Sequence, residues 1–477
     1  MREQNGKGEY DADVIIVGGG PAGSALGTYL ARDGRSVLLL EKDIHPRDHV
    51  GESLTPCTNL VFKELGILDK MNDAAFVKKP GTGWNAPESP LWKFIEVWLF
   101  EYPIPDGPQP FTYNLERDVL DTMLIRNAHD NGVKVLQGVK VKKVNFEGDR
   151  AVGVTAAVAD GWERDLRARI VVDASGRRCM LANQLNMKHK DPRFNQFCIY
   201  SWFDGVERPP ERYDGFTLFF FLGLNQAWSW YIPLRHGKTS VGIVMDKEDF
   251  QKSGKTHEEF FYAAVERNRT LKAAMKDATR VRPWWIEGDY SYKIDRFAGP
   301  GWILVGDALR FVDPIFSSGV DVALFSAKYA HETITEMLDG GDEEGTIREY
   351  QERLTTGVDV WYDLISMFYK LQNLLTRFAT SPHRREAMVR ILQGNPYIPE
   401  TQERSRALLD SMQKSYESVL ATPGSLLRPW GMDMARDHTL SCETCLGIAD
   451  YVEEEEAFVC RRCGARASTA PWPVASG

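Results

Sequence analysis

The fold of this 477-residue chain is decided by the stretch D-V-I-I-V-G-G-G-P-A-G, which runs from Asp13 to Gly23. Its β-branched start, Asp13 to Val17, predicts a buried parallel strand. Apolar residues then recur at helical spacing up to Gly34, a glycine that suits the end of a helix. A second apolar run, Ser36 to Leu40, ends at Glu41. The stretch therefore predicts a strand–helix–strand unit with a glycine-rich turn.

That turn has the spacing that binds the pyrophosphate of a dinucleotide. Gly18 permits a tight turn, Gly20 lets the backbone approach the phosphates, and Gly23 allows close packing of the helix on the strand. Ala22 lies at the helix start, where N–H groups and a positive dipole end face the phosphates. Glu41 follows Gly23 by 18 residues, near the roughly 20-residue offset at which an acidic residue binds a ribose hydroxyl. We expect these residues to bind a cofactor.

Two later strands complete the expected cofactor domain. Ile170 to Ala174 is followed by Ser175-Gly176, and Trp302 to Val305 is followed by Gly306-Asp307. Both repeat the pattern of a buried strand that ends at a small residue. The cofactor domain is therefore expected to assemble from separated pieces of the chain.

The rest of the chain predicts further layers. Asn195 to Lys293 is rich in Phe, Trp, Tyr and Thr in alternation, which predicts an antiparallel sheet covering the cofactor. From about Val320 the sequence reads mostly helical. We expect an α/β fold with these parts: a Rossmann-like cofactor domain (1–180 and 290–340), an antiparallel-sheet substrate domain (181–289), a helical C-terminal region (341–435) and a small four-cysteine ribbon (436–470).

Composition excludes several classes of function. The net charge of −9 argues against nucleic-acid binding by bulk electrostatics. The longest apolar stretch, Phe216 to Leu224, is too short for a membrane span, and Met1 to Asp13 lacks the apolar core of a secretory signal. Seven cysteines in a chain of this size do not make a disulfide scaffold. We expect a cytoplasmic protein.

Two motifs favour FAD as the cofactor. Asp307 ends a strand, where it can hydrogen-bond a ribityl chain; a helix N-cap is the alternative. Arg117 is the first residue of an R-x-x-x-D-x-x-L pattern whose aspartate is Asp121. Asp121 is either part of the cofactor site or a solvated charge on the helix surface. Together with the glycine turn, these motifs resemble the FAD-binding monooxygenase fold group. The resemblance covers about residues 12 to 335 and includes aromatic hydroxylases, geranylgeranyl reductases and halogenases.

Two segments narrow the resemblance to the flavin-dependent halogenases. Gly51 to Leu54 reads G-E-S-L, a segment that lies beside the flavin in these enzymes, so the resemblance places Glu52 and Ser53 in the cofactor site. A loop with a capping serine is the alternative. The second segment matches W-x-W-x-I-P, which most related hydroxylases lack. Alternate tryptophans on a strand often belong to the core, but in halogenases they shield the flavin from aromatic substrate. This flavin-shielding motif comprises Trp228, Trp230, Ile232 and Pro233.

A third segment, Asp313 to Val320, resembles the D-P-x-F-S-S-G-V turn of halogenases that act on phenols and pyrroles. Ser318 and Gly319 open the next helix, so their backbone N–H groups are unpaired and can hold an anion. The resemblance implies that this turn binds halide and that Pro314, Gly319 and Val320 also contact the flavin. An ordinary helix cap beside the flavin is the alternative.

The fourth feature is a lysine in Val77-Lys78-Lys79-Pro80-Gly81. Halogenases carry a lysine before such a segment, at the far end of a tunnel from the flavin, where it captures hypohalous acid. The match falls on Lys79, and Lys78 is the competing choice. Burial would lower the pKa of such a lysine and expose the free amine. Paired lysines otherwise belong mostly to the solvated surface.

Three positions depart from relatives. Halogenases of free tryptophan carry a glutamate where this chain has Phe316, so the resemblance is to the phenol and pyrrole type. Asp321 replaces a common histidine, and Arg310 stands where a small residue is usual. The sequence offers no physical account of Asp321 or Arg310.

The C-terminal region carries a separate pattern of cysteines. Two C-x-x-C pairs lie 14 residues apart and predict a tetrahedral, structural zinc site. A metal-free ribbon or two disulfides are the alternatives. The expected ligands are Cys442, Cys445, Cys460 and Cys463.

The resemblance implies a halogenase that uses reduced FAD and O₂. A separate flavin reductase supplies the reduced FAD, chloride or bromide is oxidised near Ser318 and Gly319, and hypohalous acid travels to Lys79. The implied substrate is an electron-rich arene of secondary metabolism, phenolic or pyrrolic, free or attached to a carrier protein. An aromatic hydroxylase without halide dependence is the first alternative, and a flavin-bound docking protein is the second.

Overall fold

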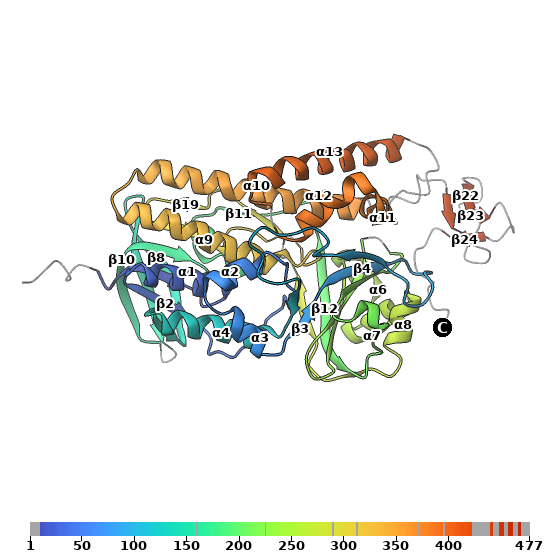
Figure 1. The fold of residues 1–477 in the computed structure, drawn as a ribbon, viewed down its shortest axis with the longest axis horizontal. Helices are drawn as coiled ribbons and strands as arrows, with labels where there is room; N and C mark the ends of the chain where they lie inside the picture. Colours follow the sequence, from blue (N-terminus) through green and yellow to red (C-terminus); the bar gives the residue numbers. More distant parts are fainter. Residues whose placement is uncertain are drawn as a thin grey trace, which may run out of the picture.

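Two β-sheets and a layer of long helices make up the chain (Figure 1). The computed structural model describes residues 10–158, 161–224, 226–288, 291–311, 313–370, 372–394 and 396–421, together with 439–441, 448–452, 457–460 and 466–468. Cys442, Cys445 and Cys463 lie outside the described residues, whereas Cys460 ends a strand.

The first sheet is built around the predicted strand–helix–strand unit. β1 runs parallel to both β10 and β2, and Val14, Ile15 and Ile16 are fully buried in it. Helix α1 packs against α4 and α9. The order along the sheet is β19 (Ala298–Gly299), β20 (Trp302–Leu304), β10 (Glu163–Asp173), β1 (Ala12–Val17), β2 (Val37–Glu41) and β7 (Lys134–Gln137), with β9 (Arg150–Val158) and β8 (Val139–Glu147) continuing from β10.

The second sheet is antiparallel, as expected, except for one pair. β4 runs parallel to β13, with Thr82 opposite Thr217. The sheet therefore takes strands from residues 81–98 as well as from the segment 181–289. Its order is β16 (Thr279–Arg280), β12 (Gln196–Asp204), β15 (Thr239–Asp246), β14 (Trp228–Pro233), β13 (Thr217–Phe221), β4 (Gly81–Asn85) and β5 (Ile95–Trp98), with β17 (Trp285–Gly288) also on β12.

Two short strand pairs and several helices surround these sheets. β3 (Val77–Lys79) pairs with β6 (Thr112–Asn114), and β11 (Lys188–Lys190) pairs with β18 (Tyr292–Ile294). The helices that precede the C-terminal layer are α1 (Pro21–Arg32), α2 (Thr58–Glu64), α3 (Leu68–Asp73), α4 (Arg117–Asp130), α5 (Met180–Gln184), α6 (Lys247–Ser253), α7 (His257–Val265), α8 (Arg269–Ala274) and α9 (Ser318–Leu338).

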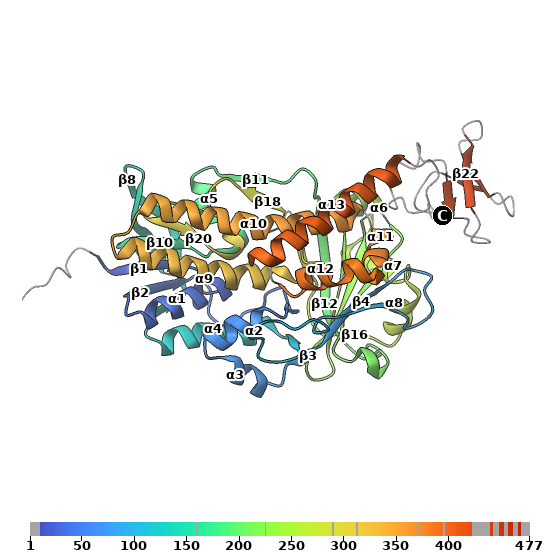
Figure 2. The ribbon, with the colours of Figure 1, turned by 45° about the horizontal axis from the view of Figure 1, so that its top comes forward.

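A layer of helices crosses both sheets (Figure 2). Its longest member, α10 (Glu343–Lys370), has 28 residues and is about 42 Å long at 1.5 Å per residue. It contacts β19 of the first sheet, and its Phe368 packs on Phe221 of the second. The layer continues through α11 (Gln372–Thr380), α12 (Pro382–Leu392) and α13 (Pro399–Ala421).

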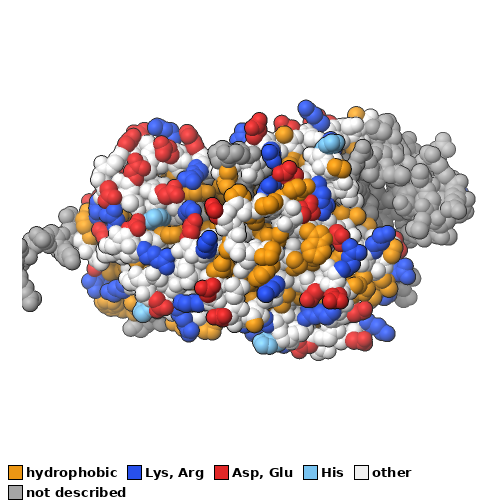
Figure 3. All heavy atoms as spheres, in the orientation of Figure 1, with side chains coloured by type: hydrophobic (Ala, Val, Ile, Leu, Met, Phe, Trp, Pro, Cys, Tyr) orange, Lys and Arg blue, Asp and Glu red, His pale blue; other side chains and the backbone are white. Residues whose placement is uncertain are grey.

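On the face shown in Figure 3, acidic and basic side chains are mixed, and apolar side chains gather near its centre. Within the described residues, every helix is too short or too polar to cross a bilayer.

The cysteine-rich segment contributes four short strands. They pair antiparallel in chain order as β21 (Thr439–Ser441), β22 (Ile448–Val452), β23 (Ala457–Cys460) and β24 (Arg466–Ser468). Within the described residues, no group of three or more His, Cys, Asp or Glu side chains is placed to hold a metal ion.

Candidate active site

A cavity of about 460 Å³ is lined by residues from both sheets. Such a volume suits a cofactor or a small-molecule ligand. The first sheet contributes the glycine turn and the ends of β2 and β10, and the second contributes residues of β13, β14 and β17. Of the predicted cofactor residues, the cavity is lined by Gly18, Gly20, Ala22, Glu41, Glu52, Ser53, Arg117, Asp307, Pro314, Gly319 and Val320.

The glycine turn is packed too closely for side chains. Gly18 has φ +115°, and a Cβ on it would lie 2.2 Å from the carbonyl oxygen of Ala174. A Cβ on Gly23 would lie 2.0 Å from the carbonyl oxygen of Gly18. Gly20 instead faces open space, with the Arg47 guanidinium 3.8 Å from where its Cβ would be. A bare backbone beneath a guanidinium fits a pyrophosphate.

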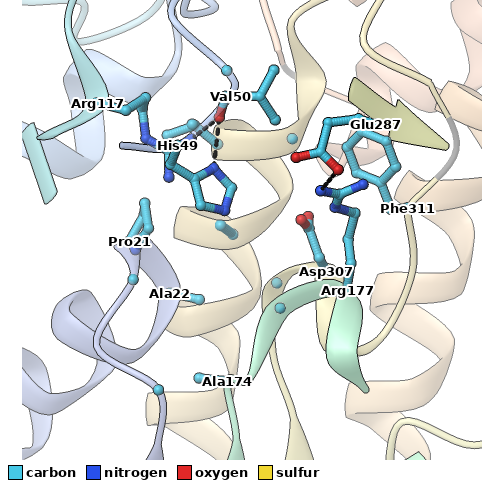
Figure 4. Close-up of a pocket in the computed structure, with 18 of the residues that line it drawn as sticks. Pro21, Ala22, His49, Val50, Arg117, Ala174, Arg177, Glu287, Asp307 and Phe311 are labelled. Carbon is cyan, nitrogen blue, oxygen red and sulfur yellow. Dashed lines mark hydrogen bonds and ion pairs between the residues drawn. The ribbon is translucent and has the colours of Figure 1, made fainter. Parts of the chain in front are cut away.

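Acidic and basic side chains around this turn are fixed by hydrogen bonds. The Glu41 carboxylate accepts N–H bonds from Gly19 at 2.6 Å and from Asp43 at 2.9 Å. The Arg117 guanidinium donates to the Asp121 carboxylate at 2.9 and 3.1 Å. It also donates to the carbonyl of Val50 at 2.6 Å (Figure 4).

The solvated-charge interpretation of Asp121 is therefore wrong. Asp121 is fully buried. Burial opposes its ionisation, but the charge and hydrogen bonds of Arg117 outweigh this and lower the pKa of Asp121. Asp121 thus remains the buried anion that orients the Arg117 guanidinium.

Asp307 faces the cavity beside an ion pair that joins the two sheets (Figure 4). Asp307 lies inside a short 3₁₀ helix (Gly306–Ala308) whose N-cap is Val305, so the N-cap alternative is wrong. Burial raises the pKa of Asp307 to about 6, although Arg177 and Arg117 oppose this. The Arg177 guanidinium, beyond β10, donates to the Glu287 carboxylate on β17 at 2.5 Å. Sequence analysis missed this pair, because 110 residues separate its members.

The flavin-shielding motif forms β14, and its residues alternate between two cores. Trp228, Trp230 and Ile232 line the cavity, whereas Tyr231 packs into the core on the other face of the sheet. Pro233 is buried at the strand end. Opposite Trp230 on β15 stands Gly242, where a Cβ would lie 2.2 Å from the indole. The indole fits there only because that position is glycine.

Each indole of the motif reaches a buried carboxyl through one hydroxyl group. Trp230 Nε1 donates to Ser240 Oγ at 3.1 Å, and Ser240 is hydrogen-bonded to Glu52. Trp202 Nε1 also donates to Glu52. Burial raises the pKa of Glu52 to about 7, against these hydrogen bonds. The corresponding path from Trp228 runs through a tyrosine of α10 to Asp313.

The turn from Asp313 to Val320, the halide turn, brings a helix N-terminus to the cavity. Ser317 has φ +59° and precedes Ser318, the first residue of α9. Ser317 and Gly319 line the cavity, but Ser318 is buried and is absent from its lining. The first N–H groups of α9 therefore lie where an anion could accept their hydrogen bonds.

The structure distinguishes the two candidate lysines. Lys79 is only 4% exposed, and its ammonium donates to the carbonyl of Leu54 at 2.9 Å. Burial lowers the pKa of Lys79 to about 7. Lys78 is exposed, with its Nζ 4.6 Å from the centre of the Phe111 ring. Burial therefore favours Lys79 as the source of a free amine.

The strand that carries Lys79 is held by the second sheet. Gly215 has φ +71°, and a Cβ on it would lie 1.9 Å from the carbonyl oxygen of Lys78. Asn114, on the partner strand β6, donates to the carbonyl of Gly215 at 2.9 Å. Lys79 is absent from the cofactor cavity's lining. It is followed by β4, whose Thr82 and Trp84 line a second, small apolar cavity, and Phe219 lines both cavities.

Comparison with known proteins agrees with this geometry. The model of the FAD binding domain family matches residues 11–359. The chain is 37% identical over 444 residues to the 1H-pyrrole-2-carbonyl-[peptidyl-carrier protein] chlorinase of Pseudomonas fluorescens, covering 89% of this chain and 98% of that protein. This chain belongs to the flavin-dependent halogenases. The aromatic hydroxylase and the docking protein are therefore excluded as its function.

Two further matches support the family. The halogenase is 32% identical over 385 residues to a 1H-pyrrole-2-carbonyl-[peptidyl-carrier protein] brominase of Pseudoalteromonas luteoviolacea, covering 80% of this chain and 91% of that protein. The structure of the chondrochloren halogenase CndH matches 84% of this chain and 97% of its own, with 32% identity and a TM-score of 0.70. The match to the structure of the flavin-dependent brominase Bmp2 covers 85% of this chain and 99% of that chain, with 28% identity and a TM-score of 0.75.

The three departures noted in the sequence have structural explanations in this halogenase. Phe316 lines the small apolar cavity and packs edge-on against Phe368, with the ring centres 5.7 Å apart. Asp321 is fully buried and accepts a hydrogen bond from Thr55 Oγ1 at 2.9 Å, and burial raises its pKa well above the ordinary value. Arg310 pairs with Asp359 of α10 at 3.2 Å. Phe316 and Arg310 therefore hold the segment before α9 against α10, and Asp321 joins α9 to the segment before α2.

Proposed function

We propose that this halogenase chlorinates or brominates a pyrrole that is attached as an acyl group to a peptidyl carrier protein. Two relatives support the substrate class, because both are named for a pyrrole-2-carbonyl group on a peptidyl carrier protein. One of them is a chlorinase and the other a brominase, so the proposal keeps both halides. A separate flavin reductase is the expected source of reduced FAD.

The cavity fits FAD and a halide. Gly18, Gly20 and Glu41 would hold the dinucleotide part, and Arg117 and Asp307 are placed to bind its polar groups. The first N–H groups of α9, at Ser318 and Gly319, would hold chloride or bromide. When bound in its reduced form, FAD supplies the O₂ chemistry that oxidises the halide.

The observation that carries the proposal is the burial of Lys79. Since burial lowers its pKa to about 7, about half of the Lys79 side chains are neutral amines near pH 7. A neutral amine can take up electrophilic halogen, and an ammonium can donate a hydrogen bond to hypohalous acid. Either form would hold the halogen away from the flavin and near the arene.

The small apolar cavity beyond Phe219 is the proposed site of the arene. Its lining is aromatic and aliphatic, the surroundings that an uncharged five-membered ring requires, but it encloses only about 20 Å³, so its lining side chains must move to admit a ring. It adjoins the strand that follows Lys79. Its residues are Thr82, Trp84, Phe219, Phe221, Ile315, Phe316, Phe368, Leu375 and Leu392.

The test uses a carrier protein loaded with pyrrole-2-carboxylate, together with FAD, a flavin reductase, O₂ and chloride or bromide. Intact-protein mass spectrometry should show the mass gain of one or more halogens. Lys79→Ala should keep FAD binding and flavin oxidation but abolish the product, and Lys78→Ala is the matched control. Product from Lys79→Ala at the wild-type rate would overturn the assignment. Equal halogenation of free pyrrole-2-carboxylate would overturn the carrier-bound substrate.

We also propose a structural zinc ion in the four-cysteine segment. The backbone register supports it: Ser441 pairs with Ile448, and Ala449 pairs with Cys460. Ser441, Ile448 and Cys460 therefore lie at the same end of the sheet, and Cys442, Cys445 and Cys463 follow Ser441 and Cys460 within three or four residues in sequence. Four thiolates would close all positions of the ion to substrate. Reduced thiolates also agree with the expected cytoplasmic location.

Metal analysis of the freshly reduced full chain tests this proposal. We expect about one zinc ion per chain. The double variant Cys442→Ser/Cys445→Ser should lose it, while Cys57→Ser, a substitution of a buried cysteine elsewhere, should retain it. A wild-type chain without zinc would contradict the prediction.

A further inference from the structure

Tyr369 joins the flavin-shielding motif to the halide turn. Its hydroxyl accepts a hydrogen bond from Trp228 Nε1 at 2.9 Å and donates one to the Asp313 carboxylate at 2.7 Å. The other carboxylate oxygen of Asp313 accepts the N–H of Ile315 at 3.0 Å. All three side chains are buried, at 1 to 3% exposure. A single hydroxyl therefore connects three segments that are remote in sequence.

The direction of these hydrogen bonds is fixed by chemistry. An indole N–H can only donate, so Tyr369 must accept from Trp228 and direct its own proton to Asp313. Burial keeps this arrangement, because it raises the pKa of the Tyr369 phenol well above its ordinary value. Burial raises the pKa of Asp313 to about 7 although this hydrogen bond opposes it, so the described orientation belongs to the ionised carboxylate.

Tyr369 comes from outside the part of the chain that matches the FAD binding domain. That match ends at residue 359, and Tyr369 lies near the C-terminal end of α10. Its ring packs edge-on against Phe194, with the centres 5.8 Å apart, and against Phe368 at 5.1 Å. Phe194 and Phe368 thus fix the tyrosine ring, while Trp228 and Asp313 fix its hydroxyl.

We propose that Tyr369 is a positioning residue of the halogenation site. Its hydroxyl holds the Trp228 indole and the halide turn in fixed positions relative to each other. The inference rests on the proposed function, because it takes Trp228 as the flavin shield and Gly319 as part of the halide site. Both residues line the cofactor cavity. If the turn moves relative to the indole, halide is held less well and reduced flavin is consumed without halogenation.

The test compares Tyr369→Phe with Tyr350→Phe. Tyr350 lies on the same helix, is also buried, and donates from its hydroxyl to the carbonyl of Leu304 at 2.7 Å. Each variant keeps the aromatic ring and loses a buried hydroxyl. A merely structural contribution would therefore affect both variants alike.

The first measurement needs neither FAD nor halide. The indole N–H resonance of Trp228 is assigned in the ¹H–¹⁵N spectrum of the FAD-free protein by its absence in Trp228→Phe. Tyr369→Phe should shift this resonance, because the hydrogen-bond acceptor is gone, whereas Tyr350→Phe should leave it in place. An unshifted resonance in Tyr369→Phe would overturn the inference.

The second measurement follows product and flavin oxidation against bromide concentration. In Tyr369→Phe the KM for bromide should rise by about fivefold or more, because about fivefold corresponds to one neutral hydrogen bond and this variant loses two, one of them to a carboxylate. Product per reduced flavin should fall, while FAD affinity stays at the wild-type value. Equal KM and equal coupling in the two variants would overturn the inference alone. A wild type that forms no halogenated product would overturn the proposed function, and the inference with it.

Discussion

The burial of Lys79 predicts a pH-dependent stability that one substitution removes. Burial alone lowers the pKa of Lys79 from 10.5 to about 7, while the unfolded chain keeps an ordinary value near 10.4. Between these values the unfolded chain binds a proton that the folded protein has released. Stability therefore rises with pH through this window, and below about pH 7 the full cost of the buried ammonium is present.

The size of the effect follows from the two pKa values. At about 1.36 kcal/mol for each pKa unit, the difference between 10.5 and about 7 corresponds to about 5 kcal/mol. Between pH 7 and pH 9 the cost falls by about 2 kcal/mol, because the folded protein is already half deprotonated at the start. Lys79→Met keeps an unbranched chain and removes the titrating group. The variant should thus be more stable than the wild type at pH 7, by a margin that shrinks by about 2 kcal/mol at pH 9.

Urea unfolding of the FAD-free protein from pH 6 to pH 9 measures this margin, with tryptophan fluorescence as the signal. Taking the difference between variant and wild type cancels every other titrating group. Lys78→Met is the matched control, because it replaces an exposed lysine of the same strand in the same way. A Lys79→Met margin that stays constant from pH 7 to pH 9 would refute the buried, readily deprotonated lysine.

Three further substitutions probe the cavity. A Cβ on Gly319 would lie 3.3 Å from the Phe311 ring, so Gly319→Val should weaken halide use far more than FAD affinity. Ser318→Ala keeps its backbone amide and should have a much smaller effect. The measurement is product rate against bromide concentration, and equal halide dependence in the wild type and both variants would contradict the prediction. Gly242→Val must displace the Trp230 indole, since even a Cβ would lie 2.2 Å from that ring. It should destabilise the protein by about 1–3 kcal/mol through overpacking, which urea unfolding would detect, and unchanged stability would contradict the fit.

Local rules predicted the parts of the site that are local in sequence. The glycine turn, the strand that ends at Glu41 and the alternation of Trp228 and Trp230 each follow from a few adjacent residues and a fixed period. The structure places all of them at one cavity.

Features that depend on distant partners were beyond the sequence. The charge of Asp121 gives no sign that the residue is buried, or that its neighbour Arg117 is held by the carbonyl of Val50, 67 residues away in sequence. The parallel pairing of β4 with β13 joins segments more than 130 residues apart. Tyr369 carries no motif at all, because its importance lies in two contacts that the helical layer creates.

The close approach of Gly215 to the strand of Lys79 has a consequence for redirecting this enzyme to other arenes. The carbonyl of Lys78 occupies the space that any side chain at Gly215 would need, so the proposed point of halogen delivery at Lys79 cannot be shifted by varying that loop. Phe221, Leu375 and Leu392 shape the apolar cavity instead. Mutant libraries should therefore vary these three positions and leave Gly215 intact. The position halogenated on each new ring would then depend on how that ring is oriented relative to the fixed Lys79 amine.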